Sequence, residues 1–221
     1  MDAQRRRTIP PVLCVLLLSA CERPGETDVP QGFVLAAKKG DERAVARMIA
    51  VDPSLARRPW KMPTDAAVRW VDRLPIVAAA GEGRTGVVRL LLDHGAPVES
   101  RDKWGTPLES AVRAGHGEVV RLLLDRGASI PPRDAEGLGA LDYAVMRSSA
   151  LAVVLLCARG ETGAAPYDYS PALSRFAARG GECDRVKAAW EATPAAERDA
   201  FVRQRVCELS APECKAMKGA P

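Results

Sequence analysis

Residues 102–128 read DKWGTPLESAVRAGHGEVVRLLLDRGA, and this stretch decides the fold. Thr106 followed by Pro107 is a typical helix start, because the Thr hydroxyl can accept a backbone N–H and Pro lacks an N–H that would have no partner there. Apolar residues at 119, 120 and 122–124 have the spacing of one buried helix face. Gly127 can end this second helix in a left-handed conformation. The stretch predicts a helix, a tight turn near Gly115, a second helix and an outward loop.

The same pattern recurs along the chain. An Ala precedes a turn residue by three or four positions and a Val follows it by five, with turn residues at 40, 83, 115, 148 and 181 and spacings of 43, 32, 33 and 33 residues. A period near 33 is typical of stacked helix pairs, because no single unit can bury its apolar face alone. The sequence therefore predicts an all-α solenoid of about five helix-turn-helix units over residues 33–190, with projecting loops.

These units resemble the ankyrin repeat, whose pattern runs Gly-x-Thr-Pro-Leu-His-x-Ala-Ala, then Gly-His, Val-Val, Leu-Leu and Gly-Ala. The resemblance implies a non-catalytic scaffold that binds other proteins with its loop tips and first helices. The chain departs from the pattern where the His should stand: Val77, Glu109 or Asp142 occupies that position, and the expected helix-to-loop hydrogen bond is lost. About ten extra residues also fall within 57–73, and such an insertion in a solenoid usually projects from one face, often the binding face.

The N-terminus has the pattern of an export signal. Three Arg at 5–7 precede an apolar run at 9–18 that is too short to span a bilayer. The sequence LSAC at 18–21 resembles the lipobox of bacterial lipoproteins, which implies cleavage before Cys21 and its acylation. We expect a signal peptide at 1–20, a flexible tether at 21–32, and an anchor in the cell envelope facing the periplasm. Glu22 weakly favours the outer over the inner membrane; ordinary secretion and an uncleaved N-terminus are the alternatives.

The C-terminal part, residues 191–221, predicts one amphipathic helix at 194–209 that caps the last repeat, followed by a tail that is loose unless a disulfide holds it. Cys157 takes the place of a helix Leu and is interpreted as a small buried side chain without a disulfide partner. Cys183, Cys207 and Cys214 remain as disulfide candidates in an exported, oxidising setting. We expect one disulfide among these three, either Cys207–Cys214 or Cys183 with one of them.

Several classes of chemistry are not expected. The net charge of +4 falls to +2 without the three Arg and one Asp of the signal peptide, so a nucleic-acid partner is not indicated. GEGRTG at 81–86 matches a dinucleotide-binding pattern, but an Ala-rich helix precedes it instead of a strand. Neither His94 nor His116 has an evident nucleophile partner, and the chain has no Cys-x-x-Cys. We therefore expect no catalytic residues, no metal and no cofactor.

Aromatic and charged residues at loop positions are the candidates for binding a partner, because aromatic and Arg side chains dominate interface hot spots. Trp104 stands at a loop tip where the repeat needs no apolar group. Trp60 and Trp70 lie in the insertion, and packing onto the solenoid is the alternative for both. The full candidate set is Trp60, Trp70, Arg101, Lys103, Trp104, Glu109, Arg113, Arg133, Glu136, Tyr167 and Tyr169.

Together these features predict a monomeric, exported and membrane-tethered protein–protein interaction module. An adaptor or assembly factor for an envelope protein is the first interpretation. An immunity protein or inhibitor that blocks a toxin or hydrolase is the alternative. An enzyme is the third, and it would require a pocket with converging polar groups and perturbed pKa values.

Overall fold

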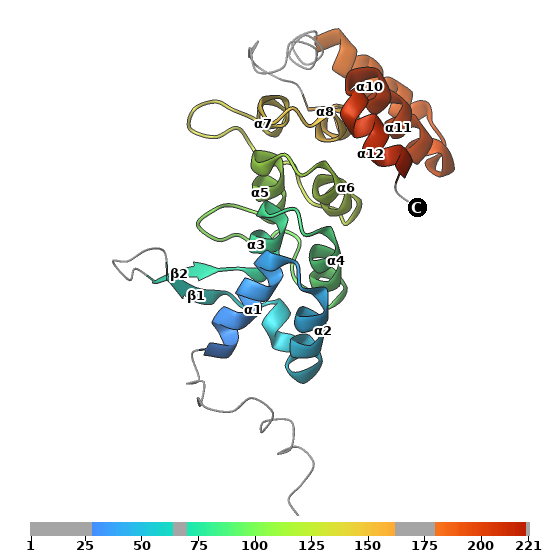
Figure 1. The fold of residues 1–221 in the computed structure, drawn as a ribbon. Coiled ribbons are helices and arrows are strands. Elements are labelled where there is room, and N and C mark those ends of the chain that lie inside the picture. The colour runs from blue at the N-terminus through green and yellow to red at the C-terminus, as the bar shows by residue number, and fades with distance from the viewer. Residues whose placement is uncertain (1–27, 64–69, 162–179, 220–221) are drawn as a thin grey trace, which may run out of the picture.

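The computed structural model describes residues 28–63, 70–161 and 180–219, and this part of the chain is mostly helical (Figure 1). Its first half contains α1 (Asp28–Lys39), α2 (Glu42–Val51), the short 3-10 helix η2 (Pro53–Ala56), β1 (Trp60–Pro63), β2 (Trp70–Arg73), α3 (Pro75–Gly81) and α4 (Thr85–Asp93). Its second half contains α5 (Pro107–Ala114), α6 (Gly117–Asp125), α7 (Ala140–Met146), α8 (Ala150–Ala158), α10 (Gly180–Ala192), the 3-10 helix η3 (Ala195–Glu197), α11 (Arg198–Leu209) and α12 (Ala211–Gly219).

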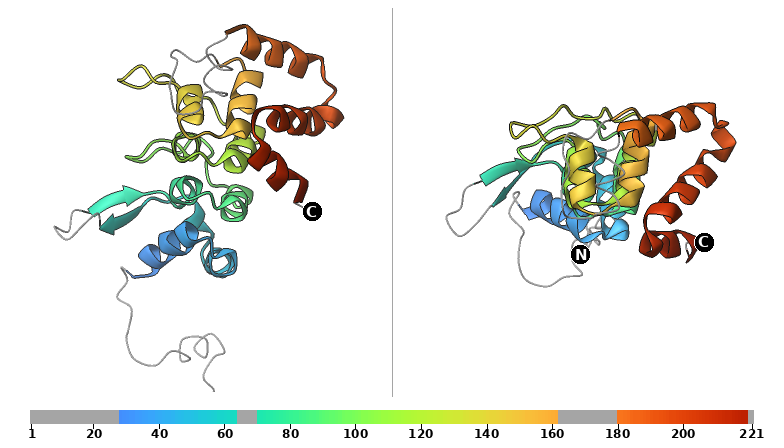
Figure 2. Two further views of the ribbon diagram at one scale, coloured as in Figure 1. Left: turned by 45° about the horizontal axis from the view of Figure 1, so that its top comes forward. Right: turned by 90° about the horizontal axis from the view of Figure 1, so that it is seen from above.

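The first eight helices form four antiparallel pairs that stack along one axis. The first helices α1, α3, α5 and α7 contact one another in sequence, and the second helices α2, α4, α6 and α8 do the same. Seen from above, the pairs lie over one another as two rows (Figure 2). Ala80, Ala111 and Ala144 are fully buried between first helices, where their small side chains permit close packing. The first four predicted units are present, and the first helix of the fifth falls outside the described residues.

The repeat around α5 and α6 forms for the reasons that its sequence suggests. Thr106 accepts from the backbone N–H of Glu109 at 3.2 Å, and the Glu109 carboxylate accepts from the N–H of Thr106 at 3.4 Å. This reciprocal capping box satisfies two N–H groups at the start of α5. Gly115 ends α5 with φ 84°, a left-handed conformation that costs glycine little. Val119, Val120 and Leu123 of α6 are then fully buried in the core.

The insertion after the first repeat forms a two-stranded antiparallel hairpin. Trp60 of β1 pairs with Arg73 of β2, and Pro63 pairs with Trp70. The hairpin projects on the same side as the longer loops between later repeats (Figure 1). It adds a small β element to an otherwise helical structure, which the all-α prediction did not include.

The C-terminal helices differ from the prediction. α10 is a single helix of 13 residues that runs through Gly181, where a turn was expected. α10 and α11 both contact α8, so that α11 lies against the side of the last described pair. Every residue of α8 is buried as a result. The tail, expected to be loose unless a disulfide held it, forms α12, which follows α11 after Ser210 alone.

Two disulfides connect these C-terminal helices. Cys157 of α8 is bonded to Cys183 of α10, and Cys207 of α11 is bonded to Cys214 of α12. The interpretation of Cys157 as an unpaired side chain is therefore wrong, although the residue is fully buried as expected. Sequence reasoning missed this pair because Cys157 occupies an ordinary core position of its helix, and only the packing of α10 brings a second sulfur to it.

The N-terminal boundary also changes. α1 begins at Asp28, inside the segment 21–32 that was expected to be a tether. Phe33, Val34 and Ala37 of this helix are buried against the repeats. No helix in the described part of the chain is long and apolar enough to cross a membrane. Cys21 lies outside the described residues.

Candidate functional site

A tight loop between α4 and α5 holds Trp104 at its tip. The backbone N–H of Asp102 donates to the carbonyl of Gly105 at 3.2 Å, and the N–H of Gly105 donates back to the carbonyl of Asp102 at 3.0 Å. The Asp102 carboxylate also accepts from the N–H of Trp104 at 2.8 Å. Trp104 remains 38% exposed although its backbone is fixed on both sides. A large aromatic side chain is thus presented to solvent by a rigid loop.

Two cations lie over the Trp104 ring. The guanidinium carbon of Arg73 is 3.9 Å from the ring centroid and the Lys103 ammonium nitrogen is 4.1 Å from it. Arg73 comes from the end of β2 and approaches the Asp102 carboxylate at 3.5 Å. Burial lowers the pKa of Arg73, and the charge of Asp102 opposes this. Cation–π contact restrains the ring and places positive charge beside it.

Glu109 links the first helix of the third repeat to its loop. Its side chain is only 9% exposed, and its carboxylate accepts hydrogen bonds from both terminal nitrogens of the Arg101 guanidinium, one of them at 3.3 Å. Arg113, one turn further along α5, lies 3.9 Å from the same carboxylate and donates to the Trp104 carbonyl at 3.3 Å. The expectation that replacing His here removes the helix-to-loop hydrogen bond is therefore wrong. A buried carboxylate and a loop Arg supply that connection.

The fourth repeat uses the same arrangement. Asp142, at the position equivalent to Glu109, is buried and accepts from Arg133 of its loop at 2.9 Å. The Asp142 carboxylate also accepts from the backbone N–H of Gly139 at 2.9 Å, which satisfies the start of α7. The recurrence shows that a carboxylate at this position and an Arg in the preceding loop act as one structural unit in two successive repeats.

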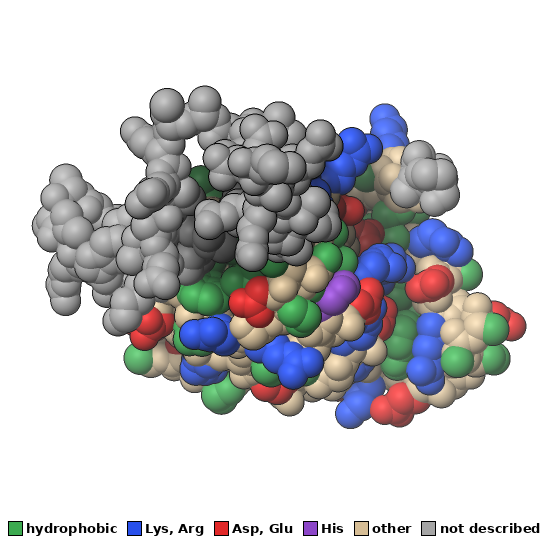
Figure 3. Space-filling view, turned by 90° about the horizontal axis from the view of Figure 1, so that it is seen from below, with side chains coloured by type: hydrophobic (Ala, Val, Ile, Leu, Met, Phe, Trp, Pro, Cys, Tyr) green, Lys and Arg blue, Asp and Glu red, His purple; other side chains and the backbone are tan. Residues whose placement is uncertain are grey.

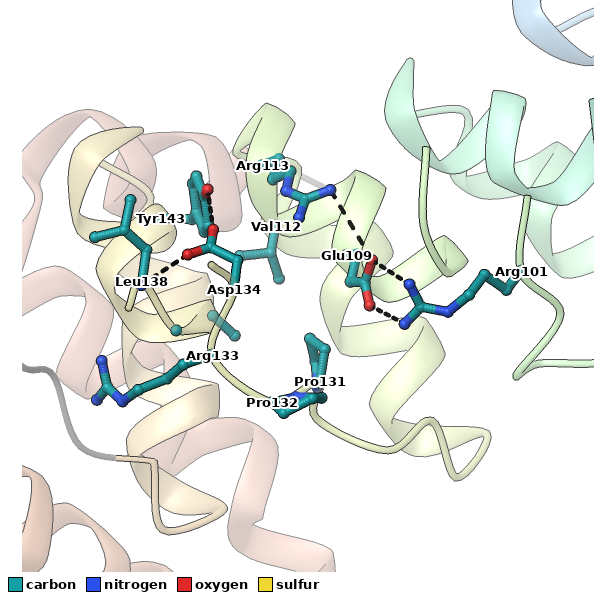
Figure 4. A pocket seen from close by; sticks show the side chains of 12 residues that line it. Arg101, Glu109, Val112, Arg113, Pro131, Pro132, Arg133, Asp134, Leu138 and Tyr143 are labelled. Carbon is teal, nitrogen blue, oxygen red and sulfur yellow. Dashed lines mark hydrogen bonds and ion pairs between the residues drawn. The ribbon is translucent and has the colours of Figure 1, made fainter. Parts of the chain in front are cut away.

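The loops and first helices of repeats three and four enclose a cavity of about 170 Å³ (Figure 4). Arg101, Arg113, Arg133, Pro131 and Tyr143 are among its lining residues, and the guanidinium of Arg133 points away from those of Arg101 and Arg113 (Figure 4). On one side Asp134 accepts from the Tyr143 hydroxyl and from the N–H of Leu138, the latter at 2.9 Å. The Tyr143 hydrogen bond lowers the pKa of Asp134, and the same bond raises the pKa of Tyr143.

The structure places the remaining candidates differently. Trp60 is half-buried against the core, and its indole N–H donates to the carbonyl of Leu55 at 3.4 Å, so it packs onto the solenoid. Lys103 and Glu136 are exposed at their loop tips. Trp70 lies in β2, but its side chain is outside the description, as are Tyr167 and Tyr169 altogether. The cluster around Trp104 therefore consists of Lys103, Arg113 and two residues that sequence reasoning missed, Arg73 and Asp102.

Elsewhere on the described surface, positively and negatively charged side chains are mixed. On the face drawn in Figure 3, Lys and Arg side chains lie among Asp and Glu side chains over the described elements. Among the described residues, ion pairs join neighbouring repeats, such as Arg126 with Asp93 at 2.9 Å and Lys38 with Glu82 at 3.3 Å. Within the described ranges, no group of three or more His, Cys, Asp or Glu side chains is arranged to hold a metal ion.

Comparison with known families identifies the repeats. Residues 33–134 match the family model for ankyrin repeats in three copies. These residues are ankyrin repeats. They include the pairs α3–α4 and α5–α6 and most of α1–α2, and the pair α7–α8 stacks on α5–α6 beyond the matched segment. Ankyrin repeats are generally non-catalytic modules for protein–protein interaction.

One curated relative is an E3 ubiquitin-protein ligase, XB3, of Oryza sativa subsp. japonica. It is 38% identical over 82 residues, which are 37% of this chain and 16% of the relative. The chain therefore spans about a sixth of that relative's length. The similarity is confined to these 82 residues of the relative.

Proposed function

We propose that this chain is an exported, lipid-anchored protein whose ankyrin repeats bind another protein of the cell envelope, as an adaptor or assembly factor. The observation that carries the proposal is the Trp104 cluster. An aromatic side chain that is more than a third exposed is held in place by a buried carboxylate and two cations. Rigid aromatic side chains beside Arg are the typical centres of protein interfaces, because little conformational entropy is lost when they bind.

The loops next to Trp104 support a continuous binding surface. Arg113 connects the Trp104 loop to α5 through the Trp104 carbonyl, and its guanidinium lies 5.4 Å from the ring of Tyr143 in the next repeat. Contacts of Arg113 therefore connect the surface of the third repeat with that of the fourth. A partner that spans both repeats would meet side chains whose positions are already set.

The anchor rests on the N-terminal sequence pattern. Cys21 would carry the lipid, and α1 begins at Asp28, seven residues later. At about 3.5 Å per residue, this segment reaches at most about 25 Å, so the repeats would lie close to the membrane surface. Substitution Cys21→Ala should release the protein from the membrane fraction of its host. Retention of the variant in that fraction would contradict the anchor.

The binding role is tested by capture from the native host. The full chain is crosslinked gently in intact cells, purified, and its partners are identified, with Trp104→Ala and Val51→Ala compared in parallel. Val51 is the matched control, since it is 87% exposed at the end of α2. We expect an envelope protein that is lost with Trp104→Ala and kept with Val51→Ala. Equal recovery by both variants would contradict the assignment of the surface, and capture of a toxin or hydrolase would replace the adaptor role by inhibition.

A further inference from the structure

The cavity between repeats three and four, here called the arginine cavity, is defined by Arg101, Arg113 and Arg133 together with the apolar walls of Pro131, Leu138 and Tyr143. Its volume of about 170 Å³ is below the roughly 300–1,000 Å³ of typical small-molecule sites. Arg113 connects the cavity to the Trp104 loop, since its guanidinium donates to the Trp104 carbonyl at 3.3 Å. The size of the cavity suits a single side chain of a bound protein.

In the arginine cavity the negatively charged groups are buried and the positively charged groups lie nearer to the surface. The carboxylates that neutralise the arginines are buried, with Glu109 9% and Asp142 2% exposed. The guanidinium groups lie outside them, with Arg101 58%, Arg113 42% and Arg133 39% exposed. An approaching partner therefore meets N–H donors first, although the group as a whole is close to neutral. Each Arg carries five N–H donors in a planar fork, and Glu109 takes only two from Arg101.

Asp134 is the one partly exposed carboxylate at the rim of the cavity, and its oxygens are already occupied. Oδ1 accepts from the N–H groups of Glu136 and Leu138 at 3.1 and 2.9 Å, and Oδ2 accepts from the Tyr143 hydroxyl. Its negative charge is thus fixed on the Tyr143 side. An incoming acid is directed away from Asp134, toward the guanidinium of Arg113, which lies between Tyr143 and Glu109, and toward Arg101 on the opposite side (Figure 4).

We propose that the arginine cavity receives one Glu or Asp side chain from an extended segment of the partner, with an apolar residue beside it. The guanidinium of Arg113 would bind the carboxylate, because planar forks match carboxylate oxygens in pairs. The apolar neighbour would pack on Pro131 and Tyr143. This inference rests on the proposed function, since it names the kind of sequence that the loop surface recognises.

The test is a selection of random dodecapeptides, displayed on phage, against the full chain. Enriched peptides are then titrated against the wild type, Arg113→Gln, Arg113→Lys and Arg126→Gln. Arg126 is the control, as a half-exposed Arg that pairs with Asp93 and does not line the cavity. We expect enriched sequences with an acid beside an apolar residue. Their affinity should fall at least tenfold with Arg113→Gln, less with Arg113→Lys, and not with Arg126→Gln.

A matched change in the peptide completes the test. Replacing its Glu by Gln should cost the wild type as much affinity as Arg113→Gln does. A selection without acidic sequences, or peptides that bind Arg113→Gln as well as the wild type, would overturn the inference. Its failure is distinguishable from failure of the proposed function: a partner captured through Trp104 while selected peptides lack acids refutes only the acid recognition. Acidic peptides that bind through Arg113 while no partner is captured refute only the adaptor role.

Discussion

Glu213 of α12 accepts a hydrogen bond, at 2.9 Å, from the backbone N–H of Leu151 in α8, 62 residues earlier in the chain. Its second oxygen accepts from the N–H of Ala150 at 2.7 Å. Both donors belong to the first turn of α8, where N–H groups have no partner inside the helix and the helix dipole favours negative charge. A carboxylate from the far end of the chain therefore completes the N-terminus of the most buried helix.

The first prediction follows from this contact. Glu213→Ala should lower the free energy of unfolding by about 1–2 kcal/mol, since two N–H groups lose a charged acceptor. Urea denaturation followed by circular dichroism measures the change. Glu208→Ala is the control, because Glu208 lies on α11 and contacts only Arg205 and Gln204 of the same helix at the surface. An equal loss in both variants would mean that Glu213 contributes no more than a surface charge.

The second prediction concerns the disulfides. Cys207 and Cys214 are half-buried, whereas Cys157 and Cys183 are 0% and 2% exposed. Graded reduction with dithiothreitol and alkylation, followed by mass spectrometry, should label Cys207 and Cys214 first. Opening this short loop should cost about 2–3 kcal/mol, because the crosslink no longer restricts the unfolded chain. Simultaneous labelling of all four cysteines would show that α12 is not released before the core unfolds.

The sequence predicted the helices of the repeats well because their signals are local. Thr106, Pro107 and Gly115 mark the ends of α5 by their own backbone chemistry, and the apolar spacing of α6 identifies its buried face. α12 was missed because it has no such apolar stripe. It is held by Glu213 and by the Cys207–Cys214 bond, and both contacts depend on where distant parts of the chain meet.

The candidate site was also predicted only in part, because some of its contacts join residues that are distant in the sequence. Trp104 stood out because the ankyrin pattern requires no aromatic residue at that tip, and the structure leaves it exposed. Arg73 was missed because its contact with Trp104 links the inserted hairpin to the next loop, 31 positions away. A usable signal did exist for Asp102: Asp134 occupies the matching position 32 residues later, and both carboxylates accept N–H groups of their own loops.

The third prediction is a pH dependence of the fourth loop. The Tyr143 hydroxyl donates to Asp134, which lowers the pKa of Asp134 below 3.8 and raises the pKa of Tyr143 above 10.0. The contribution of this bond is complete above pH 3.8 and is lost as the pH falls through the lowered pKa of Asp134. On the alkaline side it is complete below pH 10.0 and is lost as the pH rises through the raised pKa of Tyr143.

Phenolate absorbance measures the alkaline limb directly. One of the three Tyr residues should ionise later than the others in the wild type and return to the ordinary range in Asp134→Asn. Asp93→Asn, which removes only the exposed partner of Arg126, should leave the titration unchanged. A wild-type curve identical to that of Asp134→Asn would show that the hydrogen bond does not persist in solution.

The fourth prediction concerns Glu109, which caps α5 and holds Arg101. Glu109→Ala should lower the free energy of unfolding by about 2 kcal/mol, because it leaves the buried Thr106 N–H without its acceptor and removes the ion pair that holds Arg101 of the loop. Glu109→His, which restores the residue of the ankyrin pattern, should recover part of the loss if the position serves to connect helix and loop.

Urea denaturation again provides the measurement, with Glu118→Ala as the control. Glu118 is half-exposed on α6 and pairs only with Arg121 along the same helix, so its removal should change the free energy of unfolding by less than about 0.5 kcal/mol. Losses of similar size in Glu109→Ala and Glu118→Ala would contradict the role of Glu109. If Glu109→His were no more stable than Glu109→Ala, the carboxylate itself, and the Arg101 pair that it forms, would be what this repeat requires.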